Sequence, residues 1–108
     1  MNNTEFIEFR NKFNEECEDI LGTKGEAYTQ NSIDRHKNFK ANAEKLGLTP
    51  LQVWAVYFNK HIDAIIHFIK NNKEGPEGVR SNMLDARNYI DLGVSLVEEE
   101  KKKCLPII

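Results

Sequence analysis

The stretch TPLQVWAVYFNKHIDAIIHFIK, residues 49–70, decides the fold of this chain. Thr49 and Pro50 are favoured at the N-cap and the first position of a helix, and Gln52 follows Thr49 at the spacing of a capping box. After this start, apolar residues recur every three or four positions, which is the period of an α-helix. We therefore predict a central helix over 50–70 whose wide apolar face holds Trp54, Tyr57, Phe58, His61, Ile62, Ile65, Phe68 and Ile69.

Three further segments show the same period and predict helices over 4–21, 34–46 and 79–103. Gly22 follows the first of them and Gly47 the second, where glycine is typical of a helix end. The apolar faces hold Phe6, Phe9, Phe13, Cys17 and Ile20 in the first helix, Phe39, Ala43 and Leu46 in the second, and Val79, Met83, Ala86, Ile90, Gly93 and Val97 in the last.

The arrangement predicted from these helices is an all-α, four-helix bundle in a single domain over 1–108. The helices over 4–21, 50–70 and 79–103 are expected to form its core. A polar loop is predicted over 22–33, and the tail 101–108 is expected to fray. Gly93 in mid-helix costs about 1 kcal/mol relative to alanine, which indicates a close helix crossing or a subunit contact.

Composition excludes several classes of protein. A net charge of −2 provides no basic field for duplex nucleic acid. No stretch approaches the roughly 20 apolar residues that span a bilayer, so no membrane partner is expected. The first residues, MNNTEFIEF, have no signal-peptide pattern. Cys17 and Cys104 are predicted to be free thiols in a reducing compartment, the cytoplasm.

Two charged segments stand out. The first turns of the predicted second helix are basic, which opposes the helix dipole and favours a role in binding a ligand. The run EEEKKK at 98–103 predicts ion pairs within one helix, at an end that faces solvent. The residues that make the first segment basic and polar are Arg35, His36, Lys37, Asn38 and Lys40.

Carboxylates on several helices give one candidate site. Mg²⁺ prefers oxygen ligands that converge from neighbouring elements, and such a metal could support pyrophosphohydrolysis. The alternative is that acidic residues on amphipathic helices face solvent. The residues concerned are Glu15, Glu16, Asp19, Asp63, Asp85 and Asp91.

Basic and aromatic residues give a second candidate, a nucleotide pocket in which cations hold phosphate and rings stack on a base. Its cations are drawn from Lys24, Arg35, Lys37, Lys40, Lys60 and Arg87, and its rings from Tyr28, Phe39, Trp54 and Tyr89. His61 lies among apolar neighbours, where it needs a partner such as Asp85 or Asn88. A structural polar network around His61 and Lys60 is the alternative reading.

The order of these motifs resembles small phage and prophage proteins of the MazG-like, nucleotide-modification-associated type. The motifs are Lys24-Gly25-x-x-Tyr28, Arg35-x-x-Asn38-Phe39-x-x-x-Ala43, Gly47-x-Thr49-Pro50, Tyr57-x-x-Lys60-His61 and Asp85-x-x-Asn88-Tyr89. The resemblance implies an oligomeric helical bundle that binds nucleotides between its helices. It also implies Mg²⁺ held by Glu-Glu-x-x-Glu and Glu-x-x-Asp motifs.

The chain departs from that family at the metal motifs. Glu15, Glu16 and Asp19 imitate the first motif only loosely, and Asn82 stands three residues before Asp85, where the resemblance expects glutamate. These departures put turnover in doubt and leave nucleotide binding open.

Three functions follow as hypotheses. The leading one is a non-catalytic, homo-oligomeric protein that sequesters a cyclic or NAD-derived nucleotide signal in a bacterial host and so counters host defence. The second is a Mg²⁺-dependent nucleoside triphosphate pyrophosphohydrolase, with Asp85 as metal ligand. The third is a protein-binding inhibitor, which would expose an apolar or acidic face. The predicted ligand residues are Lys24, Tyr28, Arg35, Asn38, Phe39, Trp54, Lys60, His61, Asn88 and Tyr89.

Overall fold

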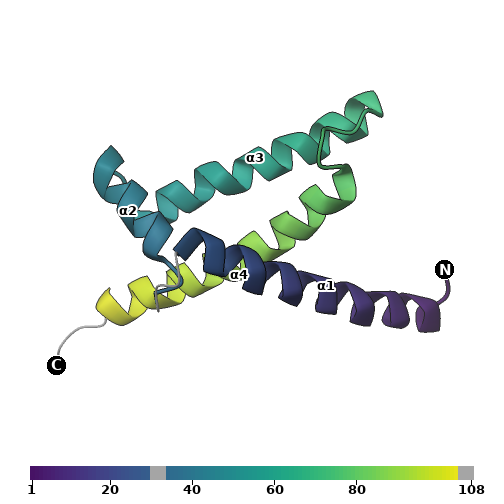
Figure 1. Cartoon of the computed structure of the whole chain (residues 1–108), viewed down its shortest axis with the longest axis horizontal. Helices are drawn as coiled ribbons and strands as arrows, with labels where there is room; N and C mark the ends of the chain where they lie inside the picture. The colour runs from purple at the N-terminus through teal and green to yellow at the C-terminus, as the bar shows by residue number, and fades with distance from the viewer. Residues whose placement is uncertain (30–33, 105–108) are drawn as a thin grey trace. The chain divides into compact units, whose positions relative to one another are not determined.

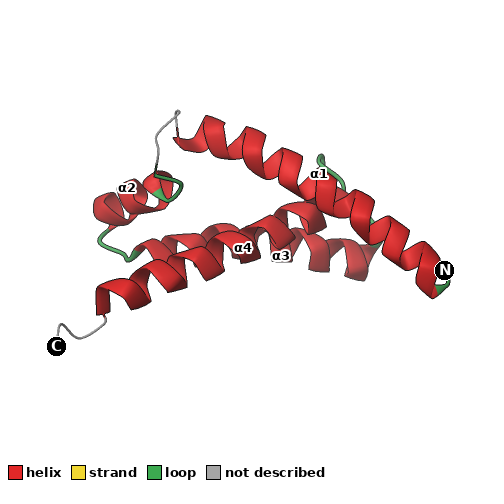
Figure 2. Ribbon diagram, turned by 90° about the horizontal axis from the view of Figure 1, so that it is seen from below, coloured by secondary structure: helices red, strands yellow, loops and turns green. Residues whose placement is uncertain are grey.

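The computed structural model describes residues 1–29 and 34–104, with side chains described for 1–23 and 34–103. Within these ranges the chain forms four helices and no strand, as Figures 1 and 2 show. This confirms the all-α prediction. The helices are α1 (Asn3–Thr29), α2 (Lys37–Leu46), α3 (Pro50–Asn71) and α4 (Val79–Cys104). The chain divides into two compact units, Met1–Arg35 and His36–Ile108.

The first unit corrects the prediction of a helix end at Gly22. α1 continues through this glycine to Thr29, so the predicted loop over 22–33 is helical through residue 29. A single glycine costs a helix only about 1 kcal/mol, and Lys24, Glu26 and Ala27 beyond it are favourable helix formers. The glycine signal was therefore weaker than the helical propensity on both sides of it.

The second unit begins with a short helix that is capped at its end as predicted. α2 starts at Lys37, three residues later than expected, after a turn at Arg35 and His36. Gly47 adopts the left-handed conformation with φ +67°, and its backbone N–H donates to the carbonyl of Ala43. Glycine is preferred there because other residues pay a steric penalty at positive φ.

α3 confirms the capping-box prediction in full. The Thr49 hydroxyl accepts from the backbone N–H of Gln52 at 3.1 Å, and the Gln52 side chain accepts from the backbone N–H of Thr49 at 2.9 Å. These two bonds satisfy donors that the first turn of a helix otherwise leaves without partners.

The core of the second unit is shared by α2, α3 and α4. Its most buried members are Phe39 and Ala43 of α2, Val53 of α3 and Leu96 of α4. The helices over 4–21, 50–70 and 79–103 were expected to form the core; within this unit α2 contributes Phe39 and Ala43 as well. Phe39 and Ala43 lie four residues apart, so the ten-residue α2 buries one face despite its polar composition.

α3 and α4 cross closely at Gly93, as the sequence predicts. A Cβ atom added to Gly93 would lie 2.6 Å from Cζ2 of Trp54. The indole N–H of Trp54 donates to the carbonyl of Tyr89 at 2.6 Å, and its ring stacks on Phe58 with 4.9 Å between centroids. Only glycine leaves room for the indole between the two helices.

No helix in the described part of the chain has the length and apolar character needed to cross a membrane.

Candidate ligand-binding site

Five rings from three helices form a connected group that we call the aromatic cluster: Phe39, Trp54, Tyr57, His61 and Tyr89. Phe39 lies 6.1 Å from Tyr57 and 6.4 Å from Tyr89, measured between ring centroids. The His61 ring lies 5.0 Å from that of Tyr89. Trp54 joins the group through its hydrogen bond to the backbone of Tyr89. Ring pairs at these distances are mutually attractive and order the core of the unit.

A set of polar atoms borders this cluster where α2 meets α3. The side-chain amide of Asn42 donates to the Tyr57 hydroxyl at 3.2 Å. The same amide donates to the carbonyl and the side-chain oxygen of Asn38, at 3.0 and 3.2 Å. Lys60 is exposed and lies one turn after Tyr57 on α3. The polar rim of Asn38, Asn42 and Tyr57 therefore combines amide and hydroxyl groups with a nearby cation.

The structure brings together half of the predicted ligand residues. Asn38, Phe39, Trp54, His61 and Tyr89 all belong to the aromatic cluster or its polar rim. Their rings pack against one another, so part of their surface is used in the core. The structural alternative for His61, a histidine held among core residues, is thus also compatible with its contacts.

Two predicted ligand cations, Arg35 and Lys24, are not described relative to this cluster. Arg35 belongs to the first unit, is exposed, and donates to the carbonyl of Leu21 at 3.2 Å. The side chains of Lys24 and Tyr28 lie outside the described residues. Convergence of Lys24, Arg35 and Lys60 on one cavity therefore stays a prediction.

Three buried polar residues lie on successive turns of α4. They are Asn82, Asp85 and Asn88, at 8%, 4% and 5% exposure. The Asn82 amide donates to the Gly78 carbonyl at 3.0 Å, near the start of the helix. Every fully buried polar side-chain atom of the described residues has a hydrogen-bond partner. The arrangement satisfies these groups within the protein, and the role of Asp85 in holding Mg²⁺ stays a prediction.

The other acidic residues considered as Mg²⁺ ligands face solvent, as the alternative interpretation expects. Their side chains are exposed on the surfaces of α1, α3 and α4, where carboxylates are well solvated. These residues are Glu15, Glu16, Asp19, Asp63 and Asp91.

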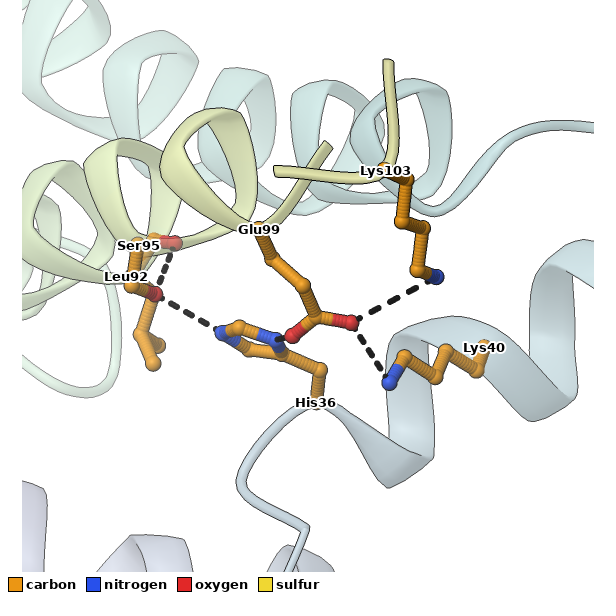
Figure 3. Close-up of polar contacts among 6 residues, drawn as sticks. All are labelled: His36, Lys40, Leu92, Ser95, Glu99 and Lys103. Carbon is orange, nitrogen blue, oxygen red and sulfur yellow. Dashed lines mark hydrogen bonds and ion pairs between the residues drawn. The ribbon is translucent and has the colours of Figure 1, made fainter. Parts of the chain in front are cut away.

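A second polar network, which the sequence did not reveal, joins the start of α2 to α4 (Figure 3). His36 is buried, with Nδ1 2.5 Å from the Glu99 carboxylate and Nε2 2.8 Å from the Ser95 hydroxyl. Lys40 lies 2.7 Å from the same carboxylate, and Lys103 lies 3.6 Å from it. Glu99 thus holds three basic side chains, two of them from α2 or the turn before it.

The hydrogen bonds around His36 fix the position of its ring. The Ser95 hydroxyl donates its hydrogen to the Leu92 carbonyl at 2.6 Å, so it is an acceptor for Nε2 of His36. The Glu99 carboxylate is an acceptor for Nδ1. Glu99 also pairs with the Lys40 ammonium, and this ion pair lowers the cost of a basic start to α2.

The order Ser95–His36–Glu99 resembles that of a nucleophile, base and acid, but its surroundings do not support nucleophilic catalysis. Ser95 lies in the interior of α4, where the backbone N–H groups are engaged in the helix and cannot form an oxyanion hole. Its hydroxyl hydrogen is directed to Leu92, and His36 donates to Ser95 instead of accepting from it. The network holds α2 against α4.

The network of His36, Lys40 and Glu99 shifts the pKa of one of its groups, the Glu99 carboxyl. Hydrogen bonds from Lys40 and then His36 lower the pKa of the Glu99 carboxyl below its ordinary value of 4.5. This corrects the interpretation of 98–103 as a solvated charge run, since Glu99 joins two helices. The basic start of α2 and the acidic run near the end of α4 were the available signals. They are about 60 residues apart, and no local pattern pairs them.

Comparison with known proteins identifies no relative. No protein-family model, curated protein or solved structure matches the chain.

Proposed function

We propose that this chain is a MazG-like helical protein that binds a nucleotide-type ligand without turning it over. In this proposal it acts as a homo-oligomer in the cytoplasm of a bacterial host, where it sequesters a cyclic or NAD-derived signal of host defence. The family and the biological role rest on the resemblance of the five ordered sequence motifs. The binding itself rests on the aromatic cluster and its polar rim.

The observation that carries the proposal is the joining of side chains that are distant in sequence into one group. Asn38, Tyr57 and Tyr89 come from three different helices, yet a chain of ring contacts and hydrogen bonds links them. Sites for small ligands combine apolar and aromatic walls with a few convergent polar groups. The cluster supplies the aromatic walls, and the rim supplies the polar groups.

Each part of this group has a distinct role in the proposed complex. Lys60 attracts a phosphate as an exposed point charge. The amides of Asn38 and Asn42 can exchange their mutual hydrogen bonds for bonds to the edge of a base, because an amide both donates and accepts. Tyr57 offers a hydroxyl next to them, and His61 lies one residue after Lys60 at the edge of the cluster.

Binding without turnover is supported by the residue at position 82. The related enzymes are expected to carry a glutamate there as a metal ligand. Asn82 instead is buried and donates to the Gly78 carbonyl, so it contributes no carboxylate. A Mg²⁺ ion held near Asp85 would have one negative ligand fewer, which weakens both metal affinity and charge neutralisation.

Titration calorimetry of the full chain tests this proposal, with a panel of cyclic dinucleotides, ADP-ribose isomers and nucleoside triphosphates. We expect heat from at least one ligand. Lys60→Ala should weaken its affinity about tenfold or more, since a hydrogen bond to a charged group contributes roughly 1.5–3 kcal/mol. Lys70→Ala is the matched control, an exposed lysine near the end of the same helix, and it should bind normally. No heat from any ligand at about 50 μM protein would refute binding at micromolar affinity.

An assay for pyrophosphate release distinguishes the enzyme hypothesis. With Mg²⁺ and nucleoside triphosphates, we expect ligand binding without release. Release that Asp85→Asn abolishes would replace the binding proposal with the pyrophosphohydrolase.

A further inference from the structure

The Glu99 carboxylate bonds to two residues that lie one turn apart at the start of α2 (Figure 3). One carboxylate oxygen lies 2.5 Å from Nδ1 of His36, and the other lies 2.7 Å from Nζ of Lys40. Glu99 extends from α4, so both contacts join α2 to α4. All three residues belong to the second unit. We call His36, Lys40 and Glu99 the Glu99 network.

α2 depends on contacts with other helices for its order. It has only ten residues, two of them asparagine, which is a poor helix former. Its N-cap residue, His36, makes no capping hydrogen bond with its side chain. Helices shorter than about 12–15 residues are marginal in water without tertiary packing. Because only Phe39 and Ala43 of α2 are buried, polar bonds at the sides of the helix have a large share in holding it.

The Glu99 network and the polar rim hold opposite sides of this helix. Residues two apart on an α-helix project about 160° apart, so Lys40 and Asn42 face away from each other, with Phe39 between them. Lys40 bonds to Glu99 of α4, and Asn42 donates to the Tyr57 hydroxyl of α3 at 3.2 Å. α2 is therefore fixed at both edges of its buried face. Without the bonds to Glu99, it would be free to rotate about Phe39 and to carry Asn42 away from Tyr57.

We propose that Glu99 is a positioning residue for the ligand site. Within the described residues its hydrogen bonds and ion pairs go to basic side chains and not to the polar rim. It acts through α2, whose orientation it sets, so that Asn38 and Asn42 stay beside Tyr57. This inference rests on the proposed function, since the rim that Glu99 positions is the one that binds the ligand. Because coupling between two sites is reciprocal, a ligand held by Asn38 and Asn42 in turn stabilises α2 in its packed position.

Hydrogen exchange measured by mass spectrometry on the free full chain tests the effect of Glu99 on α2. Losing a hydrogen bond to a charged group shifts an equilibrium about tenfold or more, so Glu99→Ala should speed exchange of the α2 amides over 40–46 by that factor. α3 and α4 should exchange at close to wild-type rates, because local opening of one helix leaves the others packed. Glu98→Ala is the matched control, an exposed neighbour on α4, and should change no rate.

A second variant removes one contact of the network and keeps the other. Lys40→Met should speed α2 exchange by a smaller factor than Glu99→Ala, because the Lys40 ammonium pairs at the surface, where water screens the pair. Faster exchange in all three helices alike would make Glu99 a general stabiliser of the unit and would overturn the proposal. Exchange of α2 at the wild-type rate in Glu99→Ala would overturn it too.

Calorimetry links these exchange rates to binding. With the nucleotide of the panel that gives the most heat, Glu99→Ala should weaken the affinity about tenfold, and Glu98→Ala should bind normally. The same nucleotide should slow α2 exchange in the wild type. Unchanged affinity in Glu99→Ala would overturn the positioning role. No heat from the wild type would instead refute the proposed function, and the exchange rates of the free chain would still decide whether Glu99 orders α2.

Discussion

Gly93→Ala tests whether the packing of α3 on α4 is as close as the structure indicates. The added Cβ atom would lie 2.6 Å from Cζ2 and 2.7 Å from Cε2 of Trp54. These distances are far below van der Waals contact, so either the indole or the helix must move. The indole is held on two sides, by its hydrogen bond to Tyr89 and by its stacking on Phe58. It cannot shift without losing one of these contacts.

The expected magnitude follows from three contributions to the free energy of unfolding. Overpacking a core costs about 1–3 kcal/mol. Displacement of the Trp54 indole would lose its hydrogen bond, worth about 1 kcal/mol. Alanine has a helix propensity better than that of glycine by about 1 kcal/mol, which opposes the other two. We expect a net destabilisation of about 1–3 kcal/mol, and each kcal/mol lowers Tm by about 4–8 °C in a domain of this size.

Thermal and urea denaturation followed by circular dichroism measure this change. Gly22→Ala is the matched control, because a Cβ atom there meets nothing within 4 Å. The control should be neutral or stabilising by up to about 1 kcal/mol. Replacing Trp54 by leucine should remove most of the penalty of Gly93→Ala when the two changes are combined. A Gly93→Ala variant as stable as the wild type would refute the close crossing.

Three further predictions concern the capping, core and network residues. Thr49→Ala should lower the free energy of unfolding by about 0.5–2 kcal/mol, while Thr49→Ser, which keeps the hydroxyl, should change it little; urea denaturation of both variants checks this. Leu96→Ala should cost about 2–5 kcal/mol, because Leu96 is only 2% exposed, and a smaller loss would place it outside the core. Since the pKa of Glu99 is lowered from 4.5, its contribution to stability is complete above that pH and is lost as pH falls below it. Between about pH 5 and 3, Tm should fall more steeply for the wild type than for Glu99→Gln, and parallel curves would argue against the network.

Local sequence signals predicted the C-terminal end of α2 and the start of α3 well, because certain residue types have a strong positional preference there. Thr49, Pro50 and Gln52 form the predicted capping box, and Gly47 ends α2 in the left-handed conformation. These features depend on residues within four positions of each other. They need no knowledge of tertiary contacts.

Two helix ends were predicted wrongly because a weak local signal was outweighed by helix propensity or by tertiary contacts. Gly22 has no steric need for glycine, and α1 continues through it. α2 was predicted to start too early, because His36 lies in a turn before the helix. Its side chain is held there by bonds to Ser95 and Glu99 of α4. In both cases, residue types that are common at helix ends were taken to mark the actual end of a helix.

Pairings between distant residues could not be deduced from the sequence. The bonds of His36 to Ser95 and Glu99 cross 59 and 63 residues. The basic turn was interpreted as a ligand site, although two of its residues, His36 and Lys40, are held by Glu99. The aromatic residues Phe39 and Tyr89 were predicted as ligand contacts from their type. The structure shows that they also pack against each other, a contact that only the topology of α2 and α4 determines.

Native mass spectrometry of the freshly purified full chain, before and after addition of the nucleotide panel, most directly tests the claim that the protein holds a nucleotide. The expected result is a protein species heavier than the bare chain or its multiples by the mass of one member of the panel, with that increment lost in Lys60→Ala and kept in Lys70→Ala. Bare protein masses at every nucleotide concentration would contradict the claim.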